Sequence, residues 1–335
     1  MRIVYVMLMV ILSNLGFGQP DESKKNALEN GTTNKSVSIQ TDTSQITKLI
    51  DLYYRYRKVD PSIALSYLRQ AQSIAFNLNY PDKVALIQYH KGYLYRLQGN
   101  YDLAIRSYIS SLDYYTSVAD ESKVAWLLID IGNLYYIQSD KLLLAKEHFE
   151  KAKQLFQKLN DNQGYALAEN NTGMVLLKMN KWEEALPYFF SSIEKSELIK
   201  DTDEKILSLY YIGEAYQQGG NLDLALNYIR QSFEICTQKK QLEGIAFGYE
   251  HFASFYVNKG DYNQAFQNYQ LAYEKYQELK DPLNSSLVLS KISSLYGKIH
   301  QVDKAISYAL LAHQIAEKQA LISVMMETLP SLSSY

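Results

Sequence analysis

Five histidines and one cysteine are the side chains of this chain best suited to metal binding or nucleophilic catalysis. No two histidines stand at metal-ligand spacing beside a carboxylate, and there is no His-Glu-x-x-His motif. Cys236 has no second cysteine to pair with, so we expect a small packing residue there. The sequence therefore predicts structural or solvated histidines at His90, His148, His251, His300 and His313.

Motifs of other chemistries are also missing from the sequence. It has no Gly-x-x-x-x-Gly-Lys-(Ser/Thr) phosphate loop and no Gly-x-Ser-x-Gly nucleophile elbow. The carboxylates at Glu183-Glu184 and at Asp201, Asp203 and Glu204 fall where helices are expected to begin, and acids there suit the helix dipole. We therefore predict that the chain is not an enzyme, with no catalytic residues, no cofactor and no metal.

The charge of the chain argues against a polyanionic partner. Its 34 basic and 36 acidic residues give a formal net charge of −2, and no block of five like charges occurs. A protein without a strongly basic field has little long-range attraction for nucleic acid or anionic lipid. The partner expected from composition is therefore not a nucleic acid.

The residues that could position a binding site recur with a fixed period. Seven alanines follow one another at intervals of 40 or 41 residues, which indicates one elongated array of helical repeats. These phased alanines are Ala64, Ala104, Ala145, Ala185, Ala225, Ala265 and Ala305.

Small and bulky residues recur at fixed distances from the alanines. A small residue precedes each of the last six alanines by twelve or thirteen positions, and a bulky residue follows most of the alanines by four. Offsets of three, four and seven place side chains on one stripe of an α-helix. Each repeat is therefore predicted to be two antiparallel helices. The small residues would allow the two helices to approach closely, and the rings would fill the space beside them. The small residues are Gly92, Gly132, Gly173, Gly213, Ala253 and Ser293.

Turn residues mark the ends of the predicted helices. Within repeats the turns include Gly99-Asn100, Ser139-Asp140 and Gly220-Asn221, where Gly and Asn suit the left-handed conformation that ends a helix. Between repeats, aspartates are suited to cap the next helix. These predicted caps are Asp60, Asp120, Asp161, Asp201 and Asp281.

This pattern resembles the tetratricopeptide repeat family. The resemblance is carried by Gly-x-x-Tyr in the first helix and Ala-x-x-x-(Phe/Tyr)-x-x-(Ala/Ser) in the second, most closely between Gly92 and Ser111, and it covers residues 44–320. The period is 40 rather than the usual ~34 residues, as in the variant found in bacterial sensory repeat proteins. The resemblance implies an all-α fold, an α-solenoid (superhelix) of antiparallel helix pairs with about seven repeats.

The chain divides into three predicted parts. Residues 1–18, with Arg2 before the apolar run 3–12 and Gly16 and Gly18 at the end, are predicted to be a signal peptide, so we expect an exported, periplasmic or secreted, bacterial protein. An uncleaved N-terminal anchor is the alternative. Residues 19–43 are polar and predicted to be a flexible leader. The solenoid is predicted over 44–335, with units 44–80, 81–120, 121–161, 162–201, 202–241, 242–281, 282–320 and a partial last helix at 321–335.

In the family that the chain resembles, first helices line a concave groove, which implies a binding surface on these helices. Aromatic and amide side chains there would suit a peptide, because rings supply contact area and amides bond an extended backbone. The candidate groove residues, on faces expected to be free of packing, are Tyr89, Tyr93, Arg96, Trp126, Asn133, Tyr136, Asn170, Met174, Tyr210, Glu214, Gln217 and Glu250.

Two functional hypotheses follow from the sequence. The first is a non-catalytic interaction module or scaffold that binds a protein or peptide segment in the groove. The alternative is the sensory, periplasmic half or a truncated fragment of a transmembrane histidine kinase or helix-turn-helix regulator, since repeat arrays similar to this one often serve such proteins. The membrane is expected to be involved only through an uncleaved signal or a missing downstream span.

Overall fold

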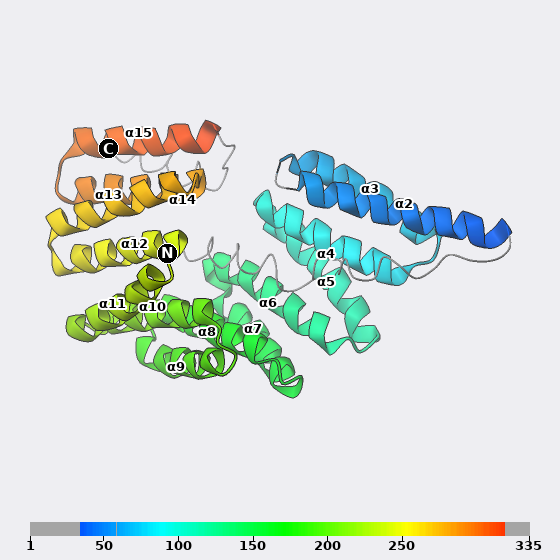
Figure 1. Ribbon diagram of the computed structural model, residues 1–335, viewed down its shortest axis with the longest axis horizontal. Coiled ribbons are helices and arrows are strands. Elements are labelled where there is room, and N and C mark those ends of the chain that lie inside the picture. Colours follow the sequence, from blue (N-terminus) through cyan, green and yellow to red (C-terminus); the bar gives the residue numbers. More distant parts are fainter. Residues whose placement is uncertain (1–33, 58, 319–335) are drawn as a thin grey trace. The chain divides into compact units, whose positions relative to one another are not determined.

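The computed structural model describes residues 34–57 and 59–318. Over this part the chain forms fourteen α-helices and one short 3-10 helix, with no strand (Figure 1). The predicted all-α solenoid of helix pairs is thereby confirmed. The predicted signal peptide at 1–18 and the predicted last helix at 321–335 lie outside the described residues.

The helices follow one another as hairpins, one in each predicted repeat. In each hairpin we call the earlier helix the first helix and the later one the second helix. The pairs are α2 (Asn34–Tyr56) with α3 (Pro61–Asn77), α4 (Pro81–Leu97) with α5 (Tyr101–Ser117), α6 (Glu121–Ile137) with α7 (Leu142–Lys158), α8 (Asn162–Lys178) with α9 (Trp182–Leu198), α10 (Thr202–Gln218) with α11 (Leu222–Gln238), α12 (Leu242–Lys259) with α13 (Tyr262–Glu278), and α14 (Pro282–Lys298) with α15 (Val302–Lys318).

Helix α2 begins earlier than the sequence suggested. It starts at Asn34, so residues 34–43 of the predicted leader are helical. This stretch contains neither glycine nor proline, and the same helix is held further along by the buried side chains of Ile46, Leu49 and Tyr53. Once a helix has nucleated, extending it by polar residues is inexpensive, which is why composition alone misplaced this boundary.

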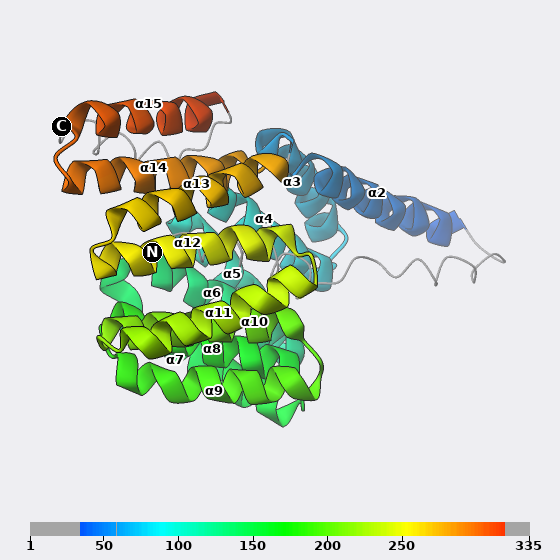
Figure 2. The same cartoon turned by 60° about the vertical axis from the view of Figure 1, so that its left-hand side comes forward.

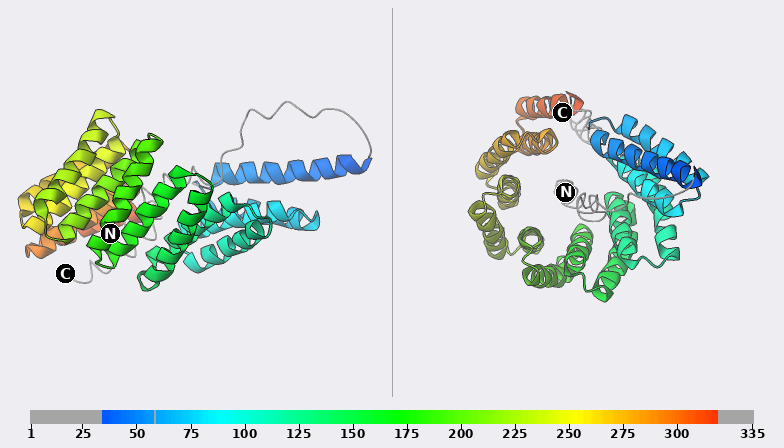
Figure 3. Two further views of the ribbon diagram at one scale, coloured as in Figure 1. Left: turned by 90° about the horizontal axis from the view of Figure 1, so that it is seen from below. Right: turned by 45° about the vertical axis from the view of Figure 1, so that its right-hand side comes forward.

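The described residues fall into two compact units, 34–159 and 160–318. Within each unit every hairpin packs on the next: α3 on α4 and α5 on α6 in one, α9 on α10, α11 on α12 and α13 on α14 in the other. Figure 2 shows α8–α15 following one another in chain order, and the views of Figure 3 show the same side-by-side stacking for α2–α7. Each unit thus buries a core that no single hairpin could form.

Inside the hairpins the small residues and the rings meet as predicted. A Cβ atom added to Gly92 would lie 2.6 Å from the Tyr108 ring, and one added to Gly173 would lie 2.5 Å from the Phe189 ring. The phased alanines are fully buried, each with 0% of its surface exposed. The two helices of a hairpin therefore approach most closely where one residue has no side chain and the other contributes a ring.

The turns confirm the predicted helix ends, with one exception. Gly99, Asn180, Gly220 and Gly260 adopt positive φ angles between 61° and 81°. The Ser139-Asp140 turn instead forms the 3-10 helix η2 (Ser139–Lys141). The predicted aspartate caps accept hydrogen bonds from backbone N–H groups of the following first turn, at Asp60, Asp120, Asp161, Asp201 and Asp281.

Candidate binding face on the first helices

First helices of successive repeats touch one another within residues 160–318. Helix α10 packs directly against both α8 and α12, in addition to its hairpin partner. Polar side chains lie along these contacts, and we call this set the first-helix face. It comprises Asn170, Ser208, Glu214, Gln217, Glu250, Ser254 and Lys291.

The part of the face between α8 and α10 is a buried hydrogen-bonded cluster. The Asn170 amide donates to the Glu204 carboxyl and to Ser208 Oγ, the latter at 2.9 Å, and Ser208 Oγ also lies 3.1 Å from Ser192 Oγ on α9. Burial raises the pKa of Glu204 to about 7, against the opposing effect of the Asn170 hydrogen bond and with the help of nearby Asp201 and Asp203. Near neutral pH this carboxyl is therefore partly protonated.

Between α10 and α12 the contact is aromatic. The Tyr210 ring stacks on His251 with centroids 4.7 Å apart, and its hydroxyl donates to the Gly244 carbonyl over 3.1 Å. Phe247 meets the other two rings edge-on. Burial lowers the pKa of His251 to about 3, so the imidazole is neutral under ordinary conditions. This histidine packs as a ring, in agreement with the structural role predicted for it.

An ion pair joins α12 to α14. Lys291 Nζ lies 2.8 Å from Glu250 Oε2, and the Tyr276 hydroxyl of α13 donates to Glu250 Oε1 over 2.6 Å. Only 2% of Glu250 is exposed, so the carboxylate depends on these two donors for its charge to be tolerated. Glu250 therefore holds three helices together and is not free to bind a ligand.

Glu214 and Gln217 are the accessible candidates on α10. Both are partly exposed, and the Gln217 amide reaches the Ser254 carbonyl on α12 over 3.4 Å. Partial burial of the Glu214 carboxyl raises its pKa above the ordinary value. A carboxyl and an amide about one turn apart on a helix offer acceptors and a donor to an extended chain laid across them.

In residues 34–159 the candidate side chains form a second polar cluster. Arg96 Nη1 on α4 lies 3.9 Å from Asp130 Oδ1 on α6, and the Arg96 guanidinium is 5.1 Å from the Tyr93 ring centroid. Burial raises the pKa of Asp130 to about 6 even though Arg96 and the Tyr89 hydroxyl favour its ionised form. Tyr89, Tyr93 and Arg96 were singled out from the sequence as groove candidates, whereas Asp130 was not.

Many of the sequence-predicted groove residues are used for packing. The faces that carry them were expected to be free, but eight are buried: Tyr93, Arg96, Asn133, Tyr136, Asn170, Met174, Tyr210 and Glu250. Trp126 is partly exposed and meets Phe156 of its own hairpin at 5.0 Å between centroids. First helices contact both their hairpin partner and their neighbours, which leaves few side chains uncovered. Whether any of the twelve binds a partner stays a prediction.

Sequence reasoning missed Glu204 and Lys291 as members of these contacts. Lys291 stands 41 residues after Glu250, close to one repeat period, so opposite charges one period apart were the available signal. Over the part of the chain described, no group of three or more His, Cys, Asp or Glu side chains could hold a metal ion. No helix in that part is long and apolar enough to cross a membrane.

The stacked hairpins place the chain among helical repeat proteins. A model of the tetratricopeptide repeat matches residues 83–158 and 164–238, which span α4–α7 and α8–α11. A solved tetratricopeptide repeat protein from Parabacteroides merdae has a similar structure, with a TM-score of 0.59 at 16% identity over 85% of this chain and 99% of the other. The chain is a tetratricopeptide repeat protein.

Other proteins are similar to the chain at low sequence identity. The regulatory protein RapD of Bacillus subtilis is 23% identical over 75% of this chain and 70% of its own length. The 43 kDa receptor-associated protein of the synapse from Tetronarce californica is 23% identical over 52% of this chain, but this chain covers only 43% of it. Among solved structures, apo RapI has a TM-score of 0.67 at 15% identity over 83% of this chain and 99% of that one.

A further solved neighbour contains a bound peptide. It is the Rap conjugation gene regulator of the plasmid pLS20 in complex with the Phr* peptide. The TM-score is 0.60 at 15% identity, and the similarity covers 91% of this chain and 81% of that one. At such identities the similarity establishes the fold.

Proposed function

We propose that the chain is an exported, non-catalytic interaction module that binds a peptide or protein segment along the first-helix face. The observation that carries the proposal is the pair of partly exposed polar side chains on α10, Glu214 and Gln217, on a face where Asn170, Ser208 and Glu250 are buried. The peptide complex of a Rap protein with the same fold supports this kind of ligand.

The binding proposal is tested with a charge reversal on each helix of one hairpin. A displayed library of random linear peptides is selected on the purified protein, and one enriched peptide is titrated against variants. We expect Glu214→Lys, on first helix α10, to weaken the affinity by about tenfold or more, equivalent to ~1.4 kcal/mol. The milder Glu214→Gln should weaken it less.

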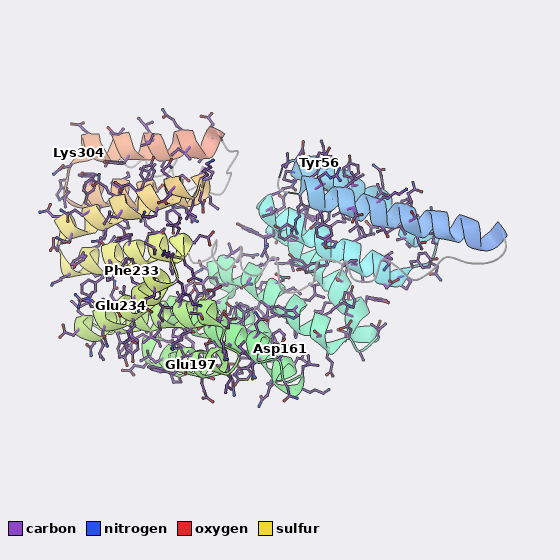
Figure 4. The ribbon with its side chains drawn as sticks, in the orientation of Figure 1. Tyr56, Asp161, Glu197, Phe233, Glu234 and Lys304 are labelled. Carbon is purple, nitrogen blue, oxygen red and sulfur yellow. The ribbon has the colours of Figure 1, made fainter. Side chains whose placement is uncertain are left out.

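The matched control is Glu234→Lys, which makes the same charge change on the exposed side of the second helix α11. Glu234 is labelled in Figure 4, and we expect its replacement to leave affinity unchanged. Circular dichroism verifies that both variants are folded. Equal affinities of the two variants, or a library that enriches no peptide, would contradict the proposal.

Export rests on the N-terminal sequence: Arg2, the apolar run 3–12 and the small residues Gly16 and Gly18. We expect protein isolated from the native envelope or medium to begin at Gln19, as read by mass spectrometry of its N-terminal peptide. The same measurement on the cytosolic fraction is the control. Protein that begins at Met1 and stays in the cytosol would refute export.

A further inference from the structure

Two arginines of residues 34–159 share one tyrosine ring. The Arg57 guanidinium, just after α2, lies 5.5 Å from the centroid of Tyr93 on α4, and the Arg96 guanidinium lies 5.1 Å from the same ring. Arg57 also lies 5.0 Å from the Tyr54 ring centroid. We call Arg57, Tyr93, Arg96, Tyr108 and Asp130 the arginine cluster.

The charges of the arginine cluster do not balance. Asp130 is its one carboxylate, at 3.9 Å from Arg96, whose side chain is only 4% exposed. Among the residues described, no carboxylate lies within ion-pair distance of Arg57. The neighbouring His90 is neutral, since burial lowers its pKa to about 3, and Asp51 of α2 is exposed. The cluster therefore carries a net charge of +1, which belongs to the partly exposed Arg57, while the buried Arg96 has Asp130 as its only carboxylate partner among the described residues.

Two donors in the arginine cluster lack acceptors. Arg96 Nε and the Tyr108 hydroxyl are buried without a hydrogen-bond partner in the described part of the chain. Tyr108 is fully buried, and its hydroxyl is close enough to Arg96 to act on it electrostatically. More than nine in ten buried polar groups in proteins are satisfied, so two neighbouring exceptions point to an acceptor that belongs between them.

We infer that the arginine cluster binds a small carboxylate. A guanidinium Nε–H and a tyrosine hydroxyl are donors that a carboxylate accepts readily, and a single negative charge neutralises the net charge of the cluster. A doubly charged phosphate would overcompensate that charge and face Asp130. All the residues involved lie in 34–159, so the inference does not depend on the peptide-binding role proposed for α10.

The test compares acetate with acetamide, which has nearly the same shape and no charge. Thermal unfolding of the purified protein is followed at constant ionic strength, set with sodium chloride. We expect acetate, but not acetamide, to raise the midpoint in a saturable way. N-acetylglutamate α-amide forms a second arm, which distinguishes a free small acid from a glutamate side chain of a partner.

Two variants and one control make the result decisive. Arg57→Gln cancels the net charge and should weaken acetate binding at least tenfold, whereas Arg55→Gln, at an exposed arginine in the last turn of α2, should not change it. Asp130→Asn removes the competing carboxylate and should tighten acetate binding. Equal midpoint shifts with acetate and acetamide would mean that water satisfies the two donors. That outcome, or acetate binding unchanged in Arg57→Gln and Asp130→Asn, would overturn the inference.

Discussion

Replacing Phe189 with alanine is expected to lower the free energy of unfolding by about 3–5 kcal/mol. The Phe189 ring is fully buried, faces Gly173 across the α8–α9 hairpin and stacks on Tyr211 of the next repeat at 5.3 Å. Glycine at position 173 cannot fill the space, so the cavity would remain between two repeats. Urea unfolding followed by circular dichroism measures the loss.

The adjacent residue provides a matched control. Phe190 lies on the same helix but is 42% exposed, with one edge-on ring contact to Tyr228 at 6.2 Å. Phe190→Ala should therefore cost less than about 1 kcal/mol. Similar losses for the two alanine variants would show that the register of packing between α8 and α9 is wrong.

A second large effect is expected from Glu204→Gln, and it should depend on pH. Burial raises the pKa of Glu204 from 4.5 to about 7. Between these values the unfolded chain releases a proton that the folded protein retains, so this group makes the folded state progressively less stable as pH rises. The shift in pKa lowers the free energy of unfolding by roughly 3 kcal/mol above pH 7. Below pH 4.5 this loss of stability disappears, because the carboxyl is protonated in both states.

Glutamine keeps an acceptor for the Asn170 amide but cannot ionise, so the variant should exceed the wild type in stability by roughly 3 kcal/mol at pH 8. Urea titrations at pH 8 and near pH 4 measure this difference. At the lower pH the two proteins should agree closely. Glu234→Gln, at an exposed position, is the control and should show no such trend. A gain that is the same at both pH values would contradict a buried Glu204 with a raised pKa.

The repeat architecture could be predicted because each of its determinants is local. Helix ends are set by residues such as Gly99 and Asp161, whose backbone and side-chain preferences act within a few positions. The contact of Gly173 with Phe189 recurs at the same phase as that of Gly92 with Tyr108. Because each hairpin needs the same close contact, the residues that make it recur with a fixed period, and this period can be read from a single sequence.

The candidate site could be predicted only in part, because burial depends on how one repeat rests on the next. Glu204 was expected to be a helix-start acid beside Asp203, and both stand in the first turn of α10. Asp203 is exposed, whereas Glu204 is buried and bonded to Asn170 on α8. Tyr93 was likewise assigned to a free face that neighbouring helices in fact cover. Burial of Glu204 and of Tyr93 depends on the neighbouring repeat, so the residues within one repeat do not reveal it.

The junctions between hairpins have a consequence for how such a chain can change its length. Lys200 and Lys280 both adopt left-handed backbone conformations, at φ angles of 58° and 53°, and each is followed directly by a capping aspartate. Excision of 201–280 would join Lys200 to Asp281 and recreate the dipeptide found at both original boundaries. Recombination at these points therefore adds or removes whole hairpins and keeps the same Lys-Asp junction between them.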